Sequence, residues 1–143
     1  MSAPLLARAM LTALAAGQGL APLFIDLNRT HATNPLWTGH ARFHLVWQTF
    51  SSTLLNALAV FLVWFHGPTS SLRFDLAALL TAIPMISFLI AMFAQSLYGG
   101  ALHDSNGIRP LPVHMGNKLF EVDMNAAVVL VAIAVLGCAV MIF

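Results

Sequence analysis

The sequence predicts an all-α membrane protein in which residues 1–143 form a single bundle of four transmembrane helices. Composition is the first reason: 59% of the 143 residues are hydrophobic and 8% are charged, whereas soluble domains carry about 25% charged residues. The mean hydropathy of +0.86 points the same way. The chain also contains four apolar stretches of about 20 residues, the length that a helix needs to cross a bilayer core. The lipid bilayer is therefore the expected environment of this chain.

The apolar stretches and their flanking residues predict helices at about 5–25, 35–65, 72–98 and 118–143. The first is interpreted as a retained helix, although its small residues also suit a signal peptide. The second is expected to begin at Pro35, because Asn34 is a good cap and proline is favoured at the first helical position. That helix would be roughly 46 Å long, so one end should project beyond the hydrocarbon. The third follows a short turn at 66–73, and the fourth extends back from its apolar run to Lys118.

An even number of helices places both termini on one side and the two long connections, 26–42 and 99–123, on the other. Five of the six histidines and four of the five acidic residues fall in these connections or beside them. The second connection is rich in Gly and Pro and too long for a plain helical hairpin, so it is expected to fold over the mouth of the bundle, with an exposed flexible loop as the alternative.

The polar face formed by these connections is expected to be cytoplasmic, because its cations outnumber those of the other side. The cations are Arg29, Arg42, Arg109 and Lys118 on this face, against Arg8 and Arg73 on the other.

Polar residues and a helix-breaking proline follow helical spacing within the predicted helices. They are His40, His44, Gln48 and Asn56 on the second helix, Gln18, Pro22 and Asp26 on the first, Gln95 on the third, and Glu121 and Asn125 on the fourth. Residues three or four apart share one face of a helix. Polar groups inside a bilayer face protein or water, so these faces are expected to converge on the axis of the bundle. Ordinary interhelical hydrogen bonding is the alternative explanation for such residues.

His40 and His44 lie one helical turn apart in the segment PLWTGHARFHLVWQTF. Such a pair can present two imidazoles to one metal ion. Zinc or iron would then take further ligands from the same surface, where His31 and His103 are expected first and Asp26 and His114 are the other candidates. A polar pocket without a metal is a second interpretation of the same residues.

An interfacial belt is the third interpretation, in which Trp37, Trp47 and the histidines anchor the helix at headgroup level. The interpretations differ in how deeply the side chains of His44 and Gln48 lie in the bundle. A site requires His44 and Gln48 to be buried in the bundle, with Asp26 hydrogen-bonded, directly or through one water, to one of the histidines. A belt requires both histidines of the pair to lie at the perimeter. The sequence leaves the three interpretations open.

Several familiar motifs are missing from the sequence. There is no glycine-rich phosphate loop and no serine nucleophile motif, and the six Lys and Arg residues are too few and too scattered for nucleic-acid binding. The single H-x-x-x-H argues against a full di-iron site of the membrane hydroxylase type.

The segment DLNRTHATNPLWTGHARFH resembles the D-x-N-x-T-H, N-P-x-W, H-x-x-F-H arrangement of a family of small four-helix membrane proteins of unknown function. More loosely, FIDL at the end of the first helix and PLW followed by FHLVWQ are similar to the EXPERA class, which contains the emopamil-binding sterol isomerases and related sterol-binding proteins. The resemblance to that class implies four or five helices around a membrane-facing cavity, in which acidic and other polar side chains meet an amphiphilic amine or sterol.

The expected function is to bind, and to act on, a small apolar or lipid-like molecule at a polar site near one membrane face. Asp26, His40 and His44 would be the catalytic groups, working by acid–base chemistry or through a bound metal ion. The residues expected to contact the ligand are Asn28, Trp37, Gln48, Asn56, Gln95, Glu121 and Asn125. The alternative is a non-catalytic accessory subunit of a larger membrane complex, and self-association also stays open.

Overall fold

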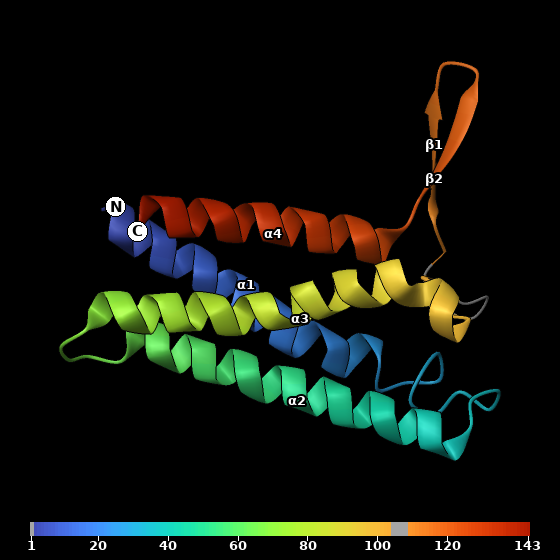
Figure 1. Cartoon of the computed structure of the whole chain (residues 1–143), viewed down its shortest axis with the longest axis horizontal. Coiled ribbons are helices and arrows are strands. Elements are labelled where there is room, and N and C mark those ends of the chain that lie inside the picture. Colours follow the sequence, from blue (N-terminus) through green and yellow to red (C-terminus); the bar gives the residue numbers. More distant parts are fainter. Residues whose placement is uncertain (1, 104–108) are drawn as a thin grey trace.

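The computed structural model describes residues 2–103 and 109–143, and its helices form a four-helix bundle (Figure 1). The helices are α1 (Ala3–Ile25), α2 (Gly39–Trp64), α3 (Ser70–Tyr98) and α4 (Met124–Ile142), and a hairpin of β1 (Leu111–Met115) and β2 (Lys118–Val122) precedes α4. All four helices are long and apolar enough to cross a membrane. The predicted number and order of the helices are confirmed.

Both termini lie at one end of the bundle, and the 26–38 loop and the hairpin lie at the other (Figure 1). The short connection between α2 and α3 turns at the end that holds the termini. The predicted placement of the two long connections at one end is therefore confirmed. Asp104, one of the acidic residues expected there, lies outside the described residues.

Helix α2 begins at Gly39, four residues later than predicted, because Asn34 is used inside the preceding loop. The Asn34 side chain accepts a hydrogen bond from the backbone N–H two residues ahead and donates one to the carbonyl of Thr30, both at 3.0 Å. These bonds close a turn in which Asn34 is buried. Thr38 caps the helix instead, and its hydroxyl accepts the N–H of Ala41 at 3.2 Å.

Helix α4 begins at Met124 rather than at Lys118, because residues 118–122 form strand β2. The two strands pair in antiparallel fashion around a two-residue turn, Gly116-Asn117, and Gly116 adopts the positive φ of 60° that such turns require. The hairpin projects sideways from the end of the bundle (Figure 1). The prediction that this connection folds over the mouth of the bundle is therefore wrong.

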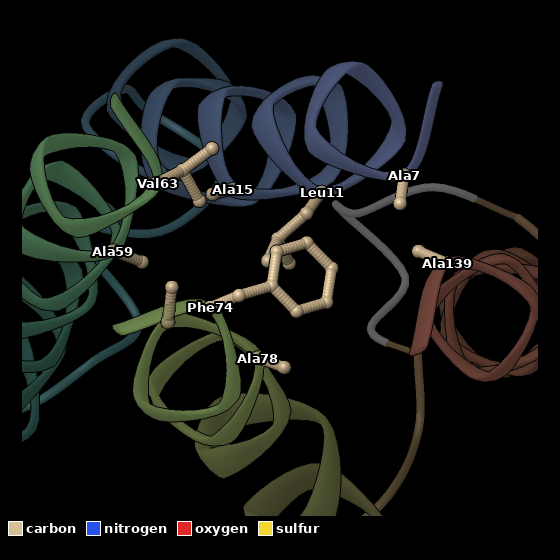
Figure 2. Close-up of a cluster of buried hydrophobic side chains, with 9 residues drawn as sticks. Ala7, Leu11, Ala15, Ala59, Val63, Phe74, Ala78 and Ala139 are labelled. Atoms are coloured by element: carbon tan, nitrogen blue, oxygen red, sulfur yellow. The ribbon is translucent and has the colours of Figure 1, made fainter. Parts of the chain in front are cut away.

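The buried core lies in the half of the bundle nearest the termini (Figure 2). Its members are mostly alanines: Ala7, Leu11 and Ala15 from α1, Ala59 and Val63 from α2, Phe74, Ala77 and Ala78 from α3, and Ala139 from α4. Small side chains let helices approach closely. Phe74 fills the space between them and stacks on the ring of Phe143 with centroids 3.8 Å apart.

The outer surface of the bundle is apolar. Large side chains such as Phe61, Phe93, Val131 and Met141 are more than half exposed. A soluble monomer rarely exposes contiguous apolar surface of this kind. Small residues inside and large apolar residues outside are the pattern expected of helices that pack against each other within lipid.

Candidate functional site

The loop between α1 and α2 is held together by polar residues of the DLNRTH segment. The Asn28 amide nitrogen donates to the carbonyls of Phe24 (3.0 Å) and Ile25 (2.8 Å), which lie in the last turn of α1, where carbonyls have no helical donor. Its Oδ1 accepts both the backbone N–H (2.8 Å) and the hydroxyl (2.6 Å) of Thr30. Asn28 was expected to contact a ligand, but its hydrogen-bonding groups are used to cap α1 and to shape the loop.

The same hydrogen bonds determine which nitrogen of His31 carries a proton. The Asn28 amide can have only one orientation, because its nitrogen faces two carbonyls and its oxygen faces an N–H. The Thr30 hydroxyl gives its single hydrogen to that oxygen, so it can only accept from His31 Nδ1, 2.7 Å away. Neutral His31 is therefore protonated on Nδ1, and its Nε2 has no hydrogen-bond partner among the described residues. The predicted ligand contact Trp37 packs against this ring in an edge-on arrangement, with centroids 5.4 Å apart.

Asp26 ends α1 next to this loop. Partial burial raises the pKa of its carboxyl group, and the positive charge of protonated His31 partly opposes the rise. Within the described residues, no Lys, Arg or His nitrogen lies within 4.0 Å of this carboxylate. None of the three histidines predicted as partners of Asp26 therefore contacts it directly, and a bond through one water stays a prediction.

His40 and His44 contact each other on the exposed surface of α2. Their Nε2 atoms are 3.0 Å apart and their rings are nearly perpendicular, so one ring donates an N–H to the other. Phe43 and Trp47 lie beside His44 with ring centroids 5.9 and 5.7 Å away. Both aromatic side chains are themselves about 60% exposed. Exposed histidines among exposed aromatic rings match the belt interpretation.

His44 and Gln48 are both exposed, so the burial that the site interpretation requires is not met, although Gln48 borders the cavity described below. The start of α2 extends beyond the end of α1 (Figure 1), so its first turns lack the neighbours that would cover them. Helical spacing correctly placed these residues on one side of α2, but it carries no information on which helices cover that side.

A cavity of about 510 Å³ lies between the four helices, in the half of the bundle away from the buried core. Its lining is mainly apolar and includes Leu14, Met85, Phe88, Val128 and Val129. Its polar lining comes from α1 and α2 and consists of Gln18, Asp26, Gln48, Thr49 and Ser52. Helices α1 and α4 meet near the termini and diverge toward the other end (Figure 1), and residues of both helices line the cavity.

Two prolines, Pro22 in α1 and Pro84 in α3, line this cavity. A proline inside a helix has no N–H, so the carbonyl one turn earlier loses its helical donor. Next to these interruptions the Gln18 side chain donates to the carbonyl of Thr81 at 3.1 Å, which ties α1 to α3. Gln18, Pro22 and Asp26 all line the cavity, as their spacing in the sequence predicted.

Asn56 is buried where α1 and α2 cross, with 1% of its surface exposed, as predicted. Its amide nitrogen donates to the carbonyl of Ser52 at 2.9 Å, and its Oδ1 has no hydrogen-bond partner among the described residues. A Cβ atom at Gly19 would lie 3.0 Å from the Cβ of Asn56, so the two helices touch here. The Thr53 hydroxyl strengthens the crossing by donating to the Gly19 carbonyl at 2.8 Å. Asn56 therefore belongs to this helix contact and not to the cavity lining.

Three other predicted site residues lie together at a different place. Gln95, His103 and Glu121 line a surface hollow of about 480 Å³ at the base of the hairpin. Glu121 was expected near Asp26 because the fourth helix was predicted to include it. In the structure it belongs to strand β2, which turns away from the bundle.

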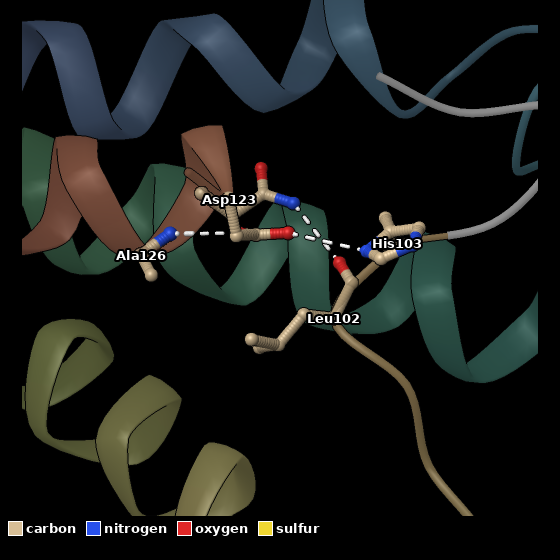
Figure 3. A network of polar contacts seen from close by, with 5 residues as sticks. Leu102, His103, Asp123 and Ala126 are labelled. Carbon is tan, nitrogen blue, oxygen red and sulfur yellow. Dashed lines mark hydrogen bonds and ion pairs between the residues drawn. The ribbon is translucent and has the colours of Figure 1, made fainter. Parts of the chain in front are cut away.

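The segment that enters α4 is fixed by three contacts (Figure 3). The Nδ1 atom of His103 lies 3.6 Å from the carboxylate of Asp123. Asp123 also accepts the N–H of Ala126 at 3.0 Å, and Asn125 donates to the carbonyl of Leu102 at 3.2 Å. Asn125, another predicted ligand contact, therefore anchors the chain before α4.

The predicted metal ligands do not form a metal centre. Within residues 2–103 and 109–143, no three His, Cys, Asp or Glu side chains come together in a group suited to hold a metal ion. His31 is engaged with the loop, His40 pairs with His44, and His103 pairs with Asp123. Zinc or iron chemistry through these four histidines is not supported by their positions.

No family model, curated protein or solved structure matches the chain. The resemblance to the EXPERA class thus rests on the short segments FIDL, PLW and FHLVWQ. Two polar residues of these segments, Asp26 and Gln48, line the cavity.

Several residues that line the cavity were missed from the sequence. Leu45, Met85 and Phe88 were not among the predicted site residues, yet all three border the empty space. A signal was present in the two prolines, since helix interruptions from different helices at one level of a bundle favour an opening there.

Proposed function

We propose that this chain is an integral membrane protein that binds a small, mostly apolar molecule in the cavity between its helices. The observation that carries the proposal is the cavity of about 510 Å³, lined by all four helices, with an apolar wall and one polar edge. Small-molecule sites have volumes of about 300–1,000 Å³ and combine apolar walls with a few polar groups. The apolar outer surface of the helices supports a location in the bilayer.

Asp26 is the residue best suited to recognise a polar group of the ligand. It lies at the cavity edge, and its raised pKa means that it keeps a proton to higher pH than a solvated carboxyl group does. The protonated form donates a hydrogen bond, and the ionised form accepts one from a hydroxyl or an amine. Gln18 and Gln48 add amide groups to the same polar edge.

His31 does not line the cavity, and in this proposal it acts only through its charge, which lowers the pKa of the Asp26 carboxyl group. In an acid–base step, the Asp26 carboxyl gives a proton to the bound molecule and the resulting carboxylate takes one back from another position of it, so the ligand keeps its total number of protons. His40 and His44 contact each other and do not line the cavity. In this proposal they belong to the interfacial belt with Trp47 rather than to the catalytic groups.

Gly17 offers a direct test, because it lines the cavity and a Cβ atom added there meets no atom within 4 Å. Gly17→Leu should therefore occupy part of the cavity without disturbing the helix contacts. Gly137 in α4 provides the matched control, since its added Cβ also meets nothing within 4 Å and it does not line the cavity.

The measurement is the amount of small molecule that copurifies with each variant, extracted from protein in identical nanodiscs and identified by mass spectrometry. We expect wild type and Gly137→Leu to retain the same apolar species, and Gly17→Leu to lose it by about tenfold or more, which corresponds to about 1.4 kcal/mol. Asp26→Asn should weaken retention of a species that carries a polar head group. Equal retention in the two glycine variants would contradict the proposal and favour the accessory-subunit alternative.

A further inference from the structure

The hairpin that precedes α4 has one apolar face. In an antiparallel pair, directly opposed residues share a face, and successive residues alternate between faces. The register therefore groups Leu111, Val113, Met115, Phe120 and Val122, with Lys118 at the tip, on one face. The other face carries Pro112, His114, Leu119 and Glu121. The hairpin thus has one apolar face and one more polar face.

The described protein leaves most of this apolar face uncovered, and Val113 alone among its members is half-buried. Leu111, Met115 and Phe120 are 52%, 67% and 47% exposed. A two-stranded hairpin has marginal stability in water unless its apolar face packs on something. Some other apolar surface must therefore complete this element.

The position of the hairpin indicates which surface that is. Strand β2 ends at Val122, and α4 begins two residues later at Met124, so the base of the hairpin is at the end of a helix suited to cross the membrane. The contact between His103 and Asp123 and the bond from Asn125 to the chain before the hairpin hold this base in place (Figure 3).

The direction of the hairpin relative to the helices indicates how it would lie in a membrane. It runs at a steep angle to the long axis of the bundle (Figure 1). In a bilayer whose normal follows the helices, the strands therefore extend along the membrane surface, and each five-residue strand covers about 17 Å.

We propose that the apolar face of the hairpin lies on the membrane, at the boundary between headgroups and acyl chains of the leaflet that holds the 26–38 loop. Phe120 and Met115 insert between lipids, and Lys118 at the tip reaches the lipid phosphates with its ammonium group. The exposed aromatic residues of α2 at this end of the bundle contact the same leaflet. The inference rests on the proposed membrane location and is independent of the cavity.

Nitroxide labels on opposite faces test the inference. Phe120 and Val113 are a directly opposed pair on the apolar face, and Leu119 and His114 are the next pair on the other face. Leu119 is itself apolar. A difference between labels at 119 and 120 would therefore reflect the face of the hairpin and not the hydrophobicity of the replaced residue. Each position is replaced by cysteine in a Cys138→Ala background, because Cys138 is exposed.

Collision rates with oxygen, which concentrates in lipid, and with a water-soluble nickel chelate are then measured in phosphatidylcholine vesicles. We expect oxygen to dominate at 113 and 120 and the nickel chelate to dominate at 114 and 119. A label at Val131, which is 65% exposed in the middle of α4, serves as the lipid reference.

The outcomes separate the two proposals. A Val131 label that is reached by the nickel chelate would contradict the membrane location itself. A lipid-facing Val131 with no difference between the hairpin faces would overturn the present inference alone. Low accessibility to both reagents at 120 together with spin–spin broadening would also overturn it, because a second copy of the chain would then cover the face.

Discussion

At the scale of single residues, His31 differs from a histidine in water, which exchanges between two neutral tautomers. The hydrogen-bond chain from the end of α1 through Asn28 and Thr30 selects the form with its proton on Nδ1. The hydrogen-bond chain thus holds the His31 ring in one orientation and one neutral form next to Asp26.

Thr30→Val removes the hydroxyl that accepts the His31 proton and keeps the branched shape of the side chain. We expect His31 to populate both neutral tautomers in this variant, instead of the single Nδ1–H form. Nitrogen-15 NMR of labelled imidazole rings at neutral to alkaline pH distinguishes the tautomers, and His31→Gln assigns the signals. Thr33→Val is the control, since Thr33 is an exposed threonine of the same loop. A Thr30→Val spectrum identical to wild type would refute the hydrogen-bond assignment.

The sequence predicted some site residues and not others for reasons that differ from residue to residue. Asp26 and Gln48 line the cavity because helical spacing correctly placed each on the inner side of its helix. Asn28 could not be assigned, since an asparagine after a helix serves equally well as a cap or as a ligand contact. His40 and His44 have the spacing of a metal pair, but they lie on the part of α2 that extends beyond α1, and how far it extends depends on the fold of the preceding loop.

At the scale of whole elements, the crossing of α1 and α2 depends on a glycine. The Cβ position at Gly19 lies 3.0 Å from Asn56, and the nearby backbone of Thr53 is 3.7 Å away. A larger residue must therefore push the two helices apart, and the buried Asn56 amide would lose its close packing against α1.

Gly19→Leu is expected to destabilise the bundle by about 1–3 kcal/mol, the usual cost of overpacking a tight contact. Unfolding in a series of denaturing detergent mixtures measures the change. Gly137→Leu again serves as the control, because its added Cβ meets no neighbour, and it should leave the transition unchanged. Equal stability of the two variants would mean that the crossing is not close.

The lengths of the apolar stretches predicted the four helices well. The helix starts that differ most from the prediction, those of α2 and α4, have local causes. The start of α2 moved because Asn34 bonds within its loop, a choice that composition alone does not reveal. The hairpin was missed although Gly116-Asn117 between two runs of strand-forming residues is a recognisable turn signal. Because the apolar run of α4 follows directly, residues 118–122 were predicted as part of that helix.

At the scale of the whole molecule, the even number of helices sets which connections share a side of the membrane. Cysteines placed at Thr33 and Asn117 are expected to react with an impermeant maleimide from the same side, and a cysteine at His66 from the opposite side. These positions lie in the 26–38 loop, the hairpin turn and the connection between α2 and α3. Labelling of sealed cells and of inverted vesicles, in the Cys138→Ala background, gives the answer. Reaction of 33 and 117 from different sides would contradict the bundle as described.

The divergence of α1 from α4 has a consequence for how any ligand reaches its site. The cavity rim includes exposed residues of both helices, among them Ala13, Ala21 and Val128, so under the proposed function the entrance faces acyl chains rather than water. Supply is then governed by the mole fraction of the ligand in the lipid phase. Adding empty vesicles at a fixed amount of ligand would dilute it in two dimensions and lower occupancy. The affinity of this site is therefore defined by the mole fraction of ligand in the lipid and not by its concentration in water.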